Sequence, residues 1–218
     1  MTSTKIVQPH HKWWFILGRE DKLSAAEIAA VLNLNKGQYG VSKKSPLLFC
    51  PKQEINPQEL IRKIGGTIKI AEEIDQSLGE EKMLEEIKKD LEKRQGKIIF
   101  GLSGYGEITK KQLESWGKEI KKYLKSKNLS VRFVPNKETT LSSATVDHNQ
   151  LIKKGAEFII YEEAARRFSL AKTIALQPYA EFSKRDFDRP GRDDKSGMLP
   201  PKLAMTLLNL STPQRNDI

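Results

Sequence analysis

The most informative segment of this sequence reads Tyr179-Ala-Glu-Phe-Ser-Lys-Arg-Asp-Phe-Asp-Arg-Pro-Gly-Arg-Asp-Asp-Lys-Ser-Gly-Met-Leu-Pro-Pro-Lys-Leu-Ala204. Acidic and basic residues alternate along it as far as Lys195, and Pro190-Gly191 predicts a turn among them. From Leu199 the residues favour a helix with Pro200-Pro201 in its first turn, where a missing N–H loses no hydrogen bond. The segment therefore predicts an extended polar strap that leads into a helix.

The expected helix has an apolar face without an evident partner in the chain. Burying one leucine side chain is worth about 1.5–3 kcal/mol, so a leucine stripe in water is unfavourable. Residues 195–197 form a flexible joint, and we expect the helix to fray or to pair with another molecule rather than to dock on its own chain. We also expect weak protection from hydrogen exchange from Tyr179 onward. The stripe consists of Leu199, Leu203, Leu207 and Leu210.

Several short motifs in this segment resemble a known family, the THUMP-containing RNA methyltransferases, and above all the tRNA guanine-N2 methyltransferases of archaea and eukaryotes with their bacterial relatives. In that family the segment leads into a strand that ends in Asp-Pro-Phe-Cys-Gly-Ser-Gly and holds S-adenosylmethionine. Neither this motif nor the family's catalytic Asn/Asp-Pro-Pro-Tyr/Phe tetrapeptide occurs here. The matching motifs are Arg185-Asp186, Arg189-Pro190, Arg192-Asp193 and Gly197-Met-Leu-Pro-Pro-Lys-Leu-Ala204.

The resemblance implies that the chain is the RNA-recognising, amino-terminal part of such an enzyme. It would dock structured RNA, in particular tRNA, and present a guanine to an S-adenosylmethionine-dependent catalytic domain outside this chain. We expect the chain alone to bind no cofactor and to be inactive. Its ending at Ile218 is compatible with a truncated gene, an excised fragment or a split enzyme with a separately encoded methyltransferase domain.

Composition indicates a soluble globular protein, with 38% hydrophobic and 30% charged residues and no apolar run long enough to span a membrane. The polar start of the chain is not a secretory signal. The single cysteine, Cys50, lies in the apolar run Leu47–Cys50 and is expected to be a buried, unreactive thiol. A reducing cytoplasm fits this composition.

The positive charge is distributed unevenly along the chain, whose net charge is +10. Residues 1–108 contain 17 Lys or Arg and 15 Asp or Glu, a net charge of +2. Residues 109–218 contain 21 and 13, a net charge of +8. A Lys-rich surface that only keeps the protein soluble is one interpretation. We favour a polyanion that binds mainly to the second half.

The order of predicted elements indicates an α/β (α+β) fold in two domains. After a loose segment at residues 1–10, residues 11–76 predict the β-α-β-β-α-β order of a ferredoxin-like domain. Its helices start at a capping box, Ser24-Ala-Ala-Glu27, and at Asn56-Pro57.

Residues 77–177 also alternate helices and strands, and the resemblance assigns them to a THUMP-like RNA-binding domain. Thr109-Lys-Lys-Gln112 predicts a capping box, and Ala164–Arg167 joins two strands. Residues 178–198 are the linker strap. Residues 199–218 would be the first helix of a Rossmann-like methyltransferase domain.

Basic residues near predicted strand and helix ends are the candidate RNA contacts. Any one of them alone is more often a solvated charge, but together they could neutralise phosphates. The set is Lys137, Lys153, Lys154, Arg166 and Arg167. In the family the strap lies beside the cofactor and RNA pockets, so the resemblance adds Arg185, Asp186, Arg189 and Arg192.

Other motifs support weaker interpretations. Gly101-Leu-Ser-Gly-Tyr-Gly106 fits neither a dinucleotide nor a Walker loop and is expected to be a glycine-rich connector. Asp186, Asp188, Asp193 and Asp194 alternate with basic residues, which favours salt bridges over a metal site. Trp13-Trp14-Phe15 could stack on bases, although at least one of these side chains should be core.

Two rival functions stay open. One is an intact methyltransferase with unrecognised motifs, and the other is a ferredoxin-like small-ligand or protein-interaction module with incidental basic charge.

Overall fold

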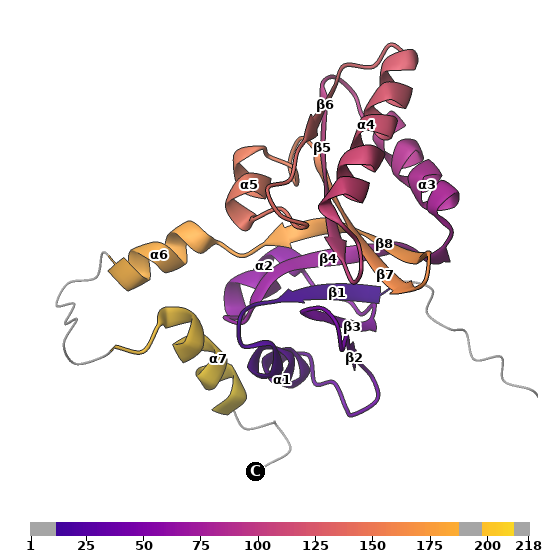
Figure 1. Cartoon of the computed structure of the whole chain (residues 1–218). Helices are drawn as coiled ribbons and strands as arrows, with labels where there is room; N and C mark the ends of the chain where they lie inside the picture. The colour runs from indigo at the N-terminus through magenta and orange to yellow at the C-terminus, as the bar shows by residue number, and fades with distance from the viewer. Residues whose placement is uncertain (1–11, 188–197, 212–218) are drawn as a thin grey trace, which may run out of the picture.

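The computed structural model describes residues 12–187 and 198–211. Within these ranges the chain forms one eight-stranded sheet with helices packed around it (Figure 1). No helix in the described part is long and apolar enough to cross a membrane. The elements are β1 (Lys12–Leu17), α1 (Asp21–Val31), β2 (Gly40–Val41), β3 (Leu47–Pro51), α2 (Pro57–Lys63), β4 (Thr67–Leu78), α3 (Glu80–Glu92), β5 (Ile98–Tyr105), α4 (Lys110–Ser126), β6 (Val131–Val134), α5 (Ser143–His148), β7 (Ala156–Ala164), β8 (Arg167–Leu176), α6 (Tyr179–Phe187) and α7 (Pro201–Ser211).

Strands β1 to β4, with α1 and α2, form the first unit. Their order in the sheet is β2-β3-β1-β4, and neighbouring strands are antiparallel. This is the ferredoxin-like arrangement that the sequence predicted. The predicted cap of α2 is also confirmed, because the Asn56 side chain accepts hydrogen bonds from the backbone N–H groups of Gln58 and Glu59.

Elements α3 to β8 form the second unit. Strand β5 is parallel to β6 and β7, while β7 and β8 form an antiparallel hairpin. The capping box at Thr109 is present at the start of α4. Strand β8 pairs with β4 from Lys69↔Leu176 to Leu78↔Phe168, so the two units share one continuous sheet. The sequence-based boundary between residues 76 and 77 falls within β4.

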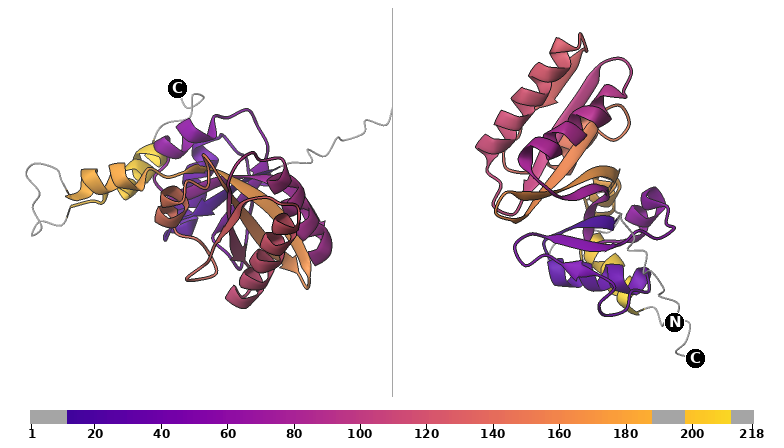
Figure 2. Two further views of the ribbon diagram at one scale, coloured as in Figure 1. Left: turned by 90° about the horizontal axis from the view of Figure 1, so that it is seen from above. Right: turned by 90° about the vertical axis from the view of Figure 1, so that its right-hand side faces the viewer.

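The shared sheet is strongly curled. Phe49 on β3 and Tyr161 on β7 belong to strands four positions apart, which a flat sheet would separate by about 19 Å. Their ring centroids are 5.6 Å apart. The curl buries an inner cluster around Trp14 and Ile159, whereas helices α1 to α4 pack on separate clusters. In Figure 2, α3 and α4 gather over one unit and α1 and α7 over the other.

Two local predictions were wrong. Helix α1 starts at Asp21, and Ser24 lies within it with its hydroxyl bonded to the Glu20 carbonyl, so Ser24 is not a cap. The segment Gly101–Gly106 is not a connector, since residues as far as Tyr105 belong to β5. A side chain at Gly101 would collide with Leu141, which explains the glycine by packing rather than by phosphate binding.

The strap is not extended where the structure describes it. Tyr179–Phe187 is the helix α6, and its Phe182 side chain is buried. Pro178 stands just before the first turn of this helix, where a proline is compatible with a helix start. Residues 1–10, Asp188, Arg189, Arg192, Asp193 and Asp194 lie outside the described residues.

The prediction for the terminal helix was wrong in two respects. Helix α7 neither frays nor stays undocked; it packs beside α1 of its own chain (Figure 1). Its leucine stripe is not the buried face either, because Leu199, Leu207 and Leu210 are exposed while Thr206 is buried. The helix therefore docks by a polar edge, which an apolar-stripe argument cannot predict.

The thiol of Cys50 is buried, as the sequence predicted, and burial raises its pKa to about 12. Since the reactive species is the thiolate, we expect iodoacetamide at pH 8 to modify Cys50 about a thousandfold more slowly in the folded protein than in concentrated urea. Because the folded-state pKa is raised, this group favours the folded state up to its ordinary pKa and loses that contribution as the pH rises further. Mass spectrometry of timed samples measures the rate, and equal rates would contradict a buried thiol.

Candidate nucleic-acid interface

The structure divides the candidate basic residues between two ends of β7. Lys153 and Lys154 immediately precede this strand, whereas Arg166 and Arg167 lie at the hairpin that follows it. The nine residues of β7 span roughly 30 Å. All four side chains belong to exposed residues. They therefore form two separate basic positions and not one patch.

Arg166 has a positive φ of 57° in the hairpin turn, and its backbone N–H donates to Glu162. The Arg167 guanidinium donates to the carbonyl of Ser77 at 3.2 Å. Part of its hydrogen-bonding capacity thus ties the hairpin to the end of β4. Lys137 is exposed in the loop between β6 and α5.

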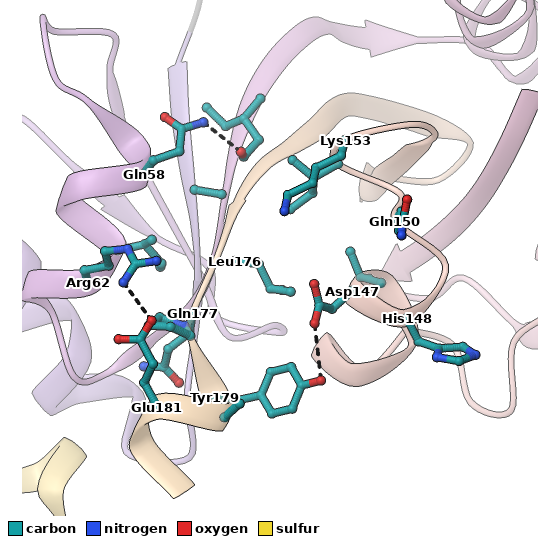
Figure 3. A pocket seen from close by; sticks show the side chains of 17 residues that line it. Gln58, Arg62, Asp147, His148, Gln150, Lys153, Leu176, Gln177, Tyr179 and Glu181 are labelled. Atoms are coloured by element: carbon teal, nitrogen blue, oxygen red, sulfur yellow. Dashed lines mark hydrogen bonds and ion pairs between the residues drawn. The ribbon is translucent and has the colours of Figure 1, made fainter. Parts of the chain in front are cut away.

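A cleft of about 760 Å³ opens between the two units, next to Lys153 (Figure 3). Helix α2 of the first unit forms one wall, the α5 region of the second unit forms the other, and the end of β8 leads from the floor into α6. Lys153 extends from the second unit toward the α2 side (Figure 3). The polar lining consists of Gln58, Arg62, Asp147, His148, Gln150, Lys153, Gln177, Tyr179 and Glu181.

Several of these polar groups are held in place by hydrogen bonds. Arg62 donates to Glu181 at 2.7 Å, which joins α2 to α6. Gln58 donates to the carbonyl of Ile174 at 3.1 Å. The Tyr179 hydroxyl points at Asp147 across the lower edge of the cleft, at 3.4 Å (Figure 3). The cationic side chains of the cleft, Arg62 and Lys153, can bind phosphates. Its amide and aromatic groups can contact bases and sugars.

A second, smaller cleft of about 210 Å³ borders the first and shares Gln58, Ile152 and Ile174 with it. Arg94 and Lys172 add two cations there. Both contact Asp90, Lys172 at 2.5 Å and Arg94 at 3.6 Å. We refer to these two adjoining clefts together as the groove between the units.

Of the four candidate residues of the strap, the structure describes Arg185 and Asp186, which lie on α6. Arg185 packs over the Phe182 ring at 5.4 Å, and Lys202 of α7 approaches the same ring at 5.5 Å. Burial lowers the pKa of the Lys202 ammonium, an effect that the nearby charge of Asp186 opposes. Arg185 and Asp186 thus lie where α6 meets α7.

The sequence analysis did not predict that residues of the first unit, Gln58 and Arg62, line the cleft. The positive charge of the second half directed attention away from Gln58 and Arg62. A signal was present, because Leu60 and Ile61 are the buried residues of α2 and leave the i,i+4 pair Gln58 and Arg62 on its exposed side. That the two units meet at this side could not be read from either one alone.

Base stacking by the early aromatic residues is excluded in this structure. Trp13, Trp14 and Phe15 are all buried, although they alternate between the faces of β1. Both faces of this strand are covered because the sheet curls over its inner side.

No protein-family model matches the chain, and no curated protein matches it at a significant level. Among solved structures, the crystal structure of TrmN from Thermus thermophilus is similar over 92% of this chain, with 13% identity and a TM-score of 0.49. A 4-thiouridine synthetase in complex with RNA and bound ATP is similar over 74% of this chain, with 13% identity and a TM-score of 0.43. The chain spans 54% and 40% of the lengths of these two proteins.

Proposed function

We propose that this chain is the RNA-binding part of a THUMP-containing tRNA methyltransferase. In this proposal it docks structured RNA in the cytoplasm and presents a guanine to an S-adenosylmethionine-dependent catalytic domain outside residues 1–218. The observation that carries RNA binding is the groove between the units, with Arg62 from one side and Lys153 from the other. The tRNA class and the guanine target rest on the sequence resemblance.

The charge distribution supports the same proposal. The excess of positive charge lies in residues 109–218, and Lys153 of that half lines the groove, with the exposed Lys154 next to it in the sequence. Phosphate contacts by exposed cations release counterions, so binding of this kind depends steeply on salt.

The test is the affinity of folded tRNA for the chain at several salt concentrations, measured by fluorescence anisotropy. We expect the logarithm of the affinity to fall linearly with the logarithm of salt concentration. Replacing Lys153 and Lys154 with alanine should weaken binding and reduce the slope by about 0.7–0.9 for each phosphate that the variant no longer neutralises. The pair Arg166 and Arg167, at the far end of β7, is replaced separately.

The matched control removes two exposed lysines away from the groove, Lys36 and Lys43. It lowers the net charge by the same amount and should leave the slope nearly unchanged. Equal effects of the control and of the Lys153/Lys154 variant would show that only net charge matters. An unchanged affinity in the folded Lys153/Lys154 variant would reject the groove as the interface.

A small-ligand module is the second candidate function, and the size of the cleft favours it. About 760 Å³ lies within the range of small-molecule sites. Failure of the chain to bind RNA at any salt concentration would favour this function over the first.

A further inference from the structure

The carboxylate of Glu27, on α1, is fully buried and connects three segments of the chain. One oxygen, Oε1, accepts from the Gly65 N–H at 2.8 Å and from the Asn209 side-chain amide at 2.7 Å. The other, Oε2, accepts from the Gly66 N–H at 2.8 Å and from the Thr206 hydroxyl at 3.2 Å. Each oxygen thus binds one backbone donor after α2 and one side chain of α7.

The two kinds of donor have different roles. A buried carboxylate is costly unless hydrogen bonds satisfy it, and the backbone N–H groups of Gly65 and Gly66 supply two such bonds within the first unit. These two bonds do not depend on α7. Glu27 is therefore fixed in place as an acceptor to which Thr206 and Asn209 can bind.

The backbone around Gly65 is shaped for a close approach of α7. A Cβ atom at Gly65 would collide with the carbonyl oxygen of Lys202 and would lie 2.8 Å from the Thr206 hydroxyl. The Gly65 carbonyl accepts from the buried Gln177 side chain at 2.8 Å, which ties this turn to the residue after β8. Asn209 also donates to the Lys63 carbonyl at 2.8 Å.

The exposed leucines of α7 contribute little to this docking. Leu207, Leu208 and Leu210 are 37% to 68% exposed. The buried residue of the helix is Thr206, so polar groups and close backbone packing hold α7 on α1.

We propose that Glu27 is a positioning residue that latches α7 onto the first unit by its polar edge. The latch sets the position and direction of α7 relative to the groove between the units. The sequence resemblance implies that α7 leads into the catalytic domain of the proposed function, so the latch would also set the distance from bound RNA to the active site. This last consequence rests on the proposed function, whereas the latch itself does not.

The test replaces the two α7 donors with side chains of similar shape, Thr206→Val and Asn209→Leu, and leaves Glu27 with its backbone partners. Losing hydrogen bonds to a charged acceptor should make amide exchange in residues 202–211 at least about tenfold faster. The exchange of β4 and β8 should not change. Thr206→Ser keeps a hydroxyl donor and is the matched control, with exchange close to that of the original chain.

A position measurement distinguishes a latch from a merely stabilising contact. Spin labels at Lys22→Cys on α1 and Leu208→Cys on the exposed side of α7 should give one narrow distance distribution in the original chain and a broad one in the double variant. Cys50 is buried and does not compete for the label. Unchanged exchange in α7 together with a narrow distribution in the double variant would overturn the proposal.

The same double variant separates the latch from the proposed function. Helix α7 does not line the cleft, so the variant should bind tRNA with the affinity of the original chain. If neither protein binds RNA, the proposed function fails while the exchange result still decides the latch. If only the double variant loses RNA binding, α7 forms part of the RNA interface and the latch is not an independent device.

Discussion

Replacing Lys69 with methionine is expected to lower the free energy of unfolding by about 3–5 kcal/mol. The Lys69 ammonium on β4 lies 2.5 Å from the Glu157 carboxylate on β7, and both side chains are almost completely buried. Removing the cation would leave a buried carboxylate without its countercharge, which is the costly half of such a pair. The effect should be large because the carboxylate cannot move into water.

The surrounding hydrogen bonds make this pair a junction between the two units. Glu157 also accepts from Ser103 at 2.6 Å and from Thr173 at 2.7 Å, while Lys69 donates to the Leu141 carbonyl at 2.7 Å. The network thus joins β4 of the first unit to β5, β7, β8 and the α5 loop of the second. We expect its loss to loosen the contact on which the groove depends.

Urea denaturation followed by circular dichroism measures the effect. The control is Lys44→Met, because Lys44 pairs with Glu107 at 3.0 Å on the surface, where both side chains are more than half exposed. That variant should lower the free energy of unfolding far less than Lys69→Met, because water and salt screen an exposed ion pair. The double replacement Lys69→Met and Glu157→Gln should recover part of the loss. A loss below about 1 kcal/mol in Lys69→Met would show that water reaches the pair.

The sequence did not indicate this network. Polar and apolar residues alternate from Thr67 to Ile70, and Lys69 occupies a polar position of this pattern, which normally faces solvent. It is buried because the sheet curls and brings residues 88 positions away over the same face. No local pattern of the sequence links Lys69 to Glu157.

Local signals predicted the parts of the fold that depend on local chemistry. The caps at Asn56 and Thr109 satisfy backbone donors within three residues, and both were predicted correctly. Ser24 shows the limit of this argument, since Glu27 three residues later serves the distant Gly65 and Gly66 instead of a capping box. The segment Ser24–Glu27 has the composition of a capping box, but its glutamate makes a tertiary contact instead.

The candidate site was predicted in part. Lys153 lines the cleft, but Arg62 and Gln58 come from a helix that the charge argument left out. Lys153 and Arg167 are far apart because they lie at opposite ends of β7. The sequence alone did not show this, because it requires the position and length of that strand. The role of all these residues in RNA binding stays a prediction.

Replacing Trp14 with alanine is the second change for which we expect a large effect, a loss of about 3–5 kcal/mol in the free energy of unfolding. Trp14 is fully buried in the inner cluster of the sheet. Its ring meets Phe49 edge-on at 5.1 Å and Tyr161 at 6.5 Å, and its N–H donates to Glu73 at 3.0 Å. The control is Leu207→Ala on the exposed side of α7, which should change the stability by about 0.5 kcal/mol or less.

A double-mutant cycle with Tyr161→Ala tests the curl of the sheet directly. Trp14 belongs to β1 and Tyr161 to β7, with β4 and β8 between them, so these side chains can interact only if the inner face closes. An edge-to-face aromatic pair adds about 0.5–1.5 kcal/mol beyond the burial of its members. The stability lost in the double variant should therefore be smaller, by this amount, than the sum of the losses in the two single variants. Strictly additive losses, measured by urea denaturation of the two single variants and the double variant, would mean that the two units stand open in solution.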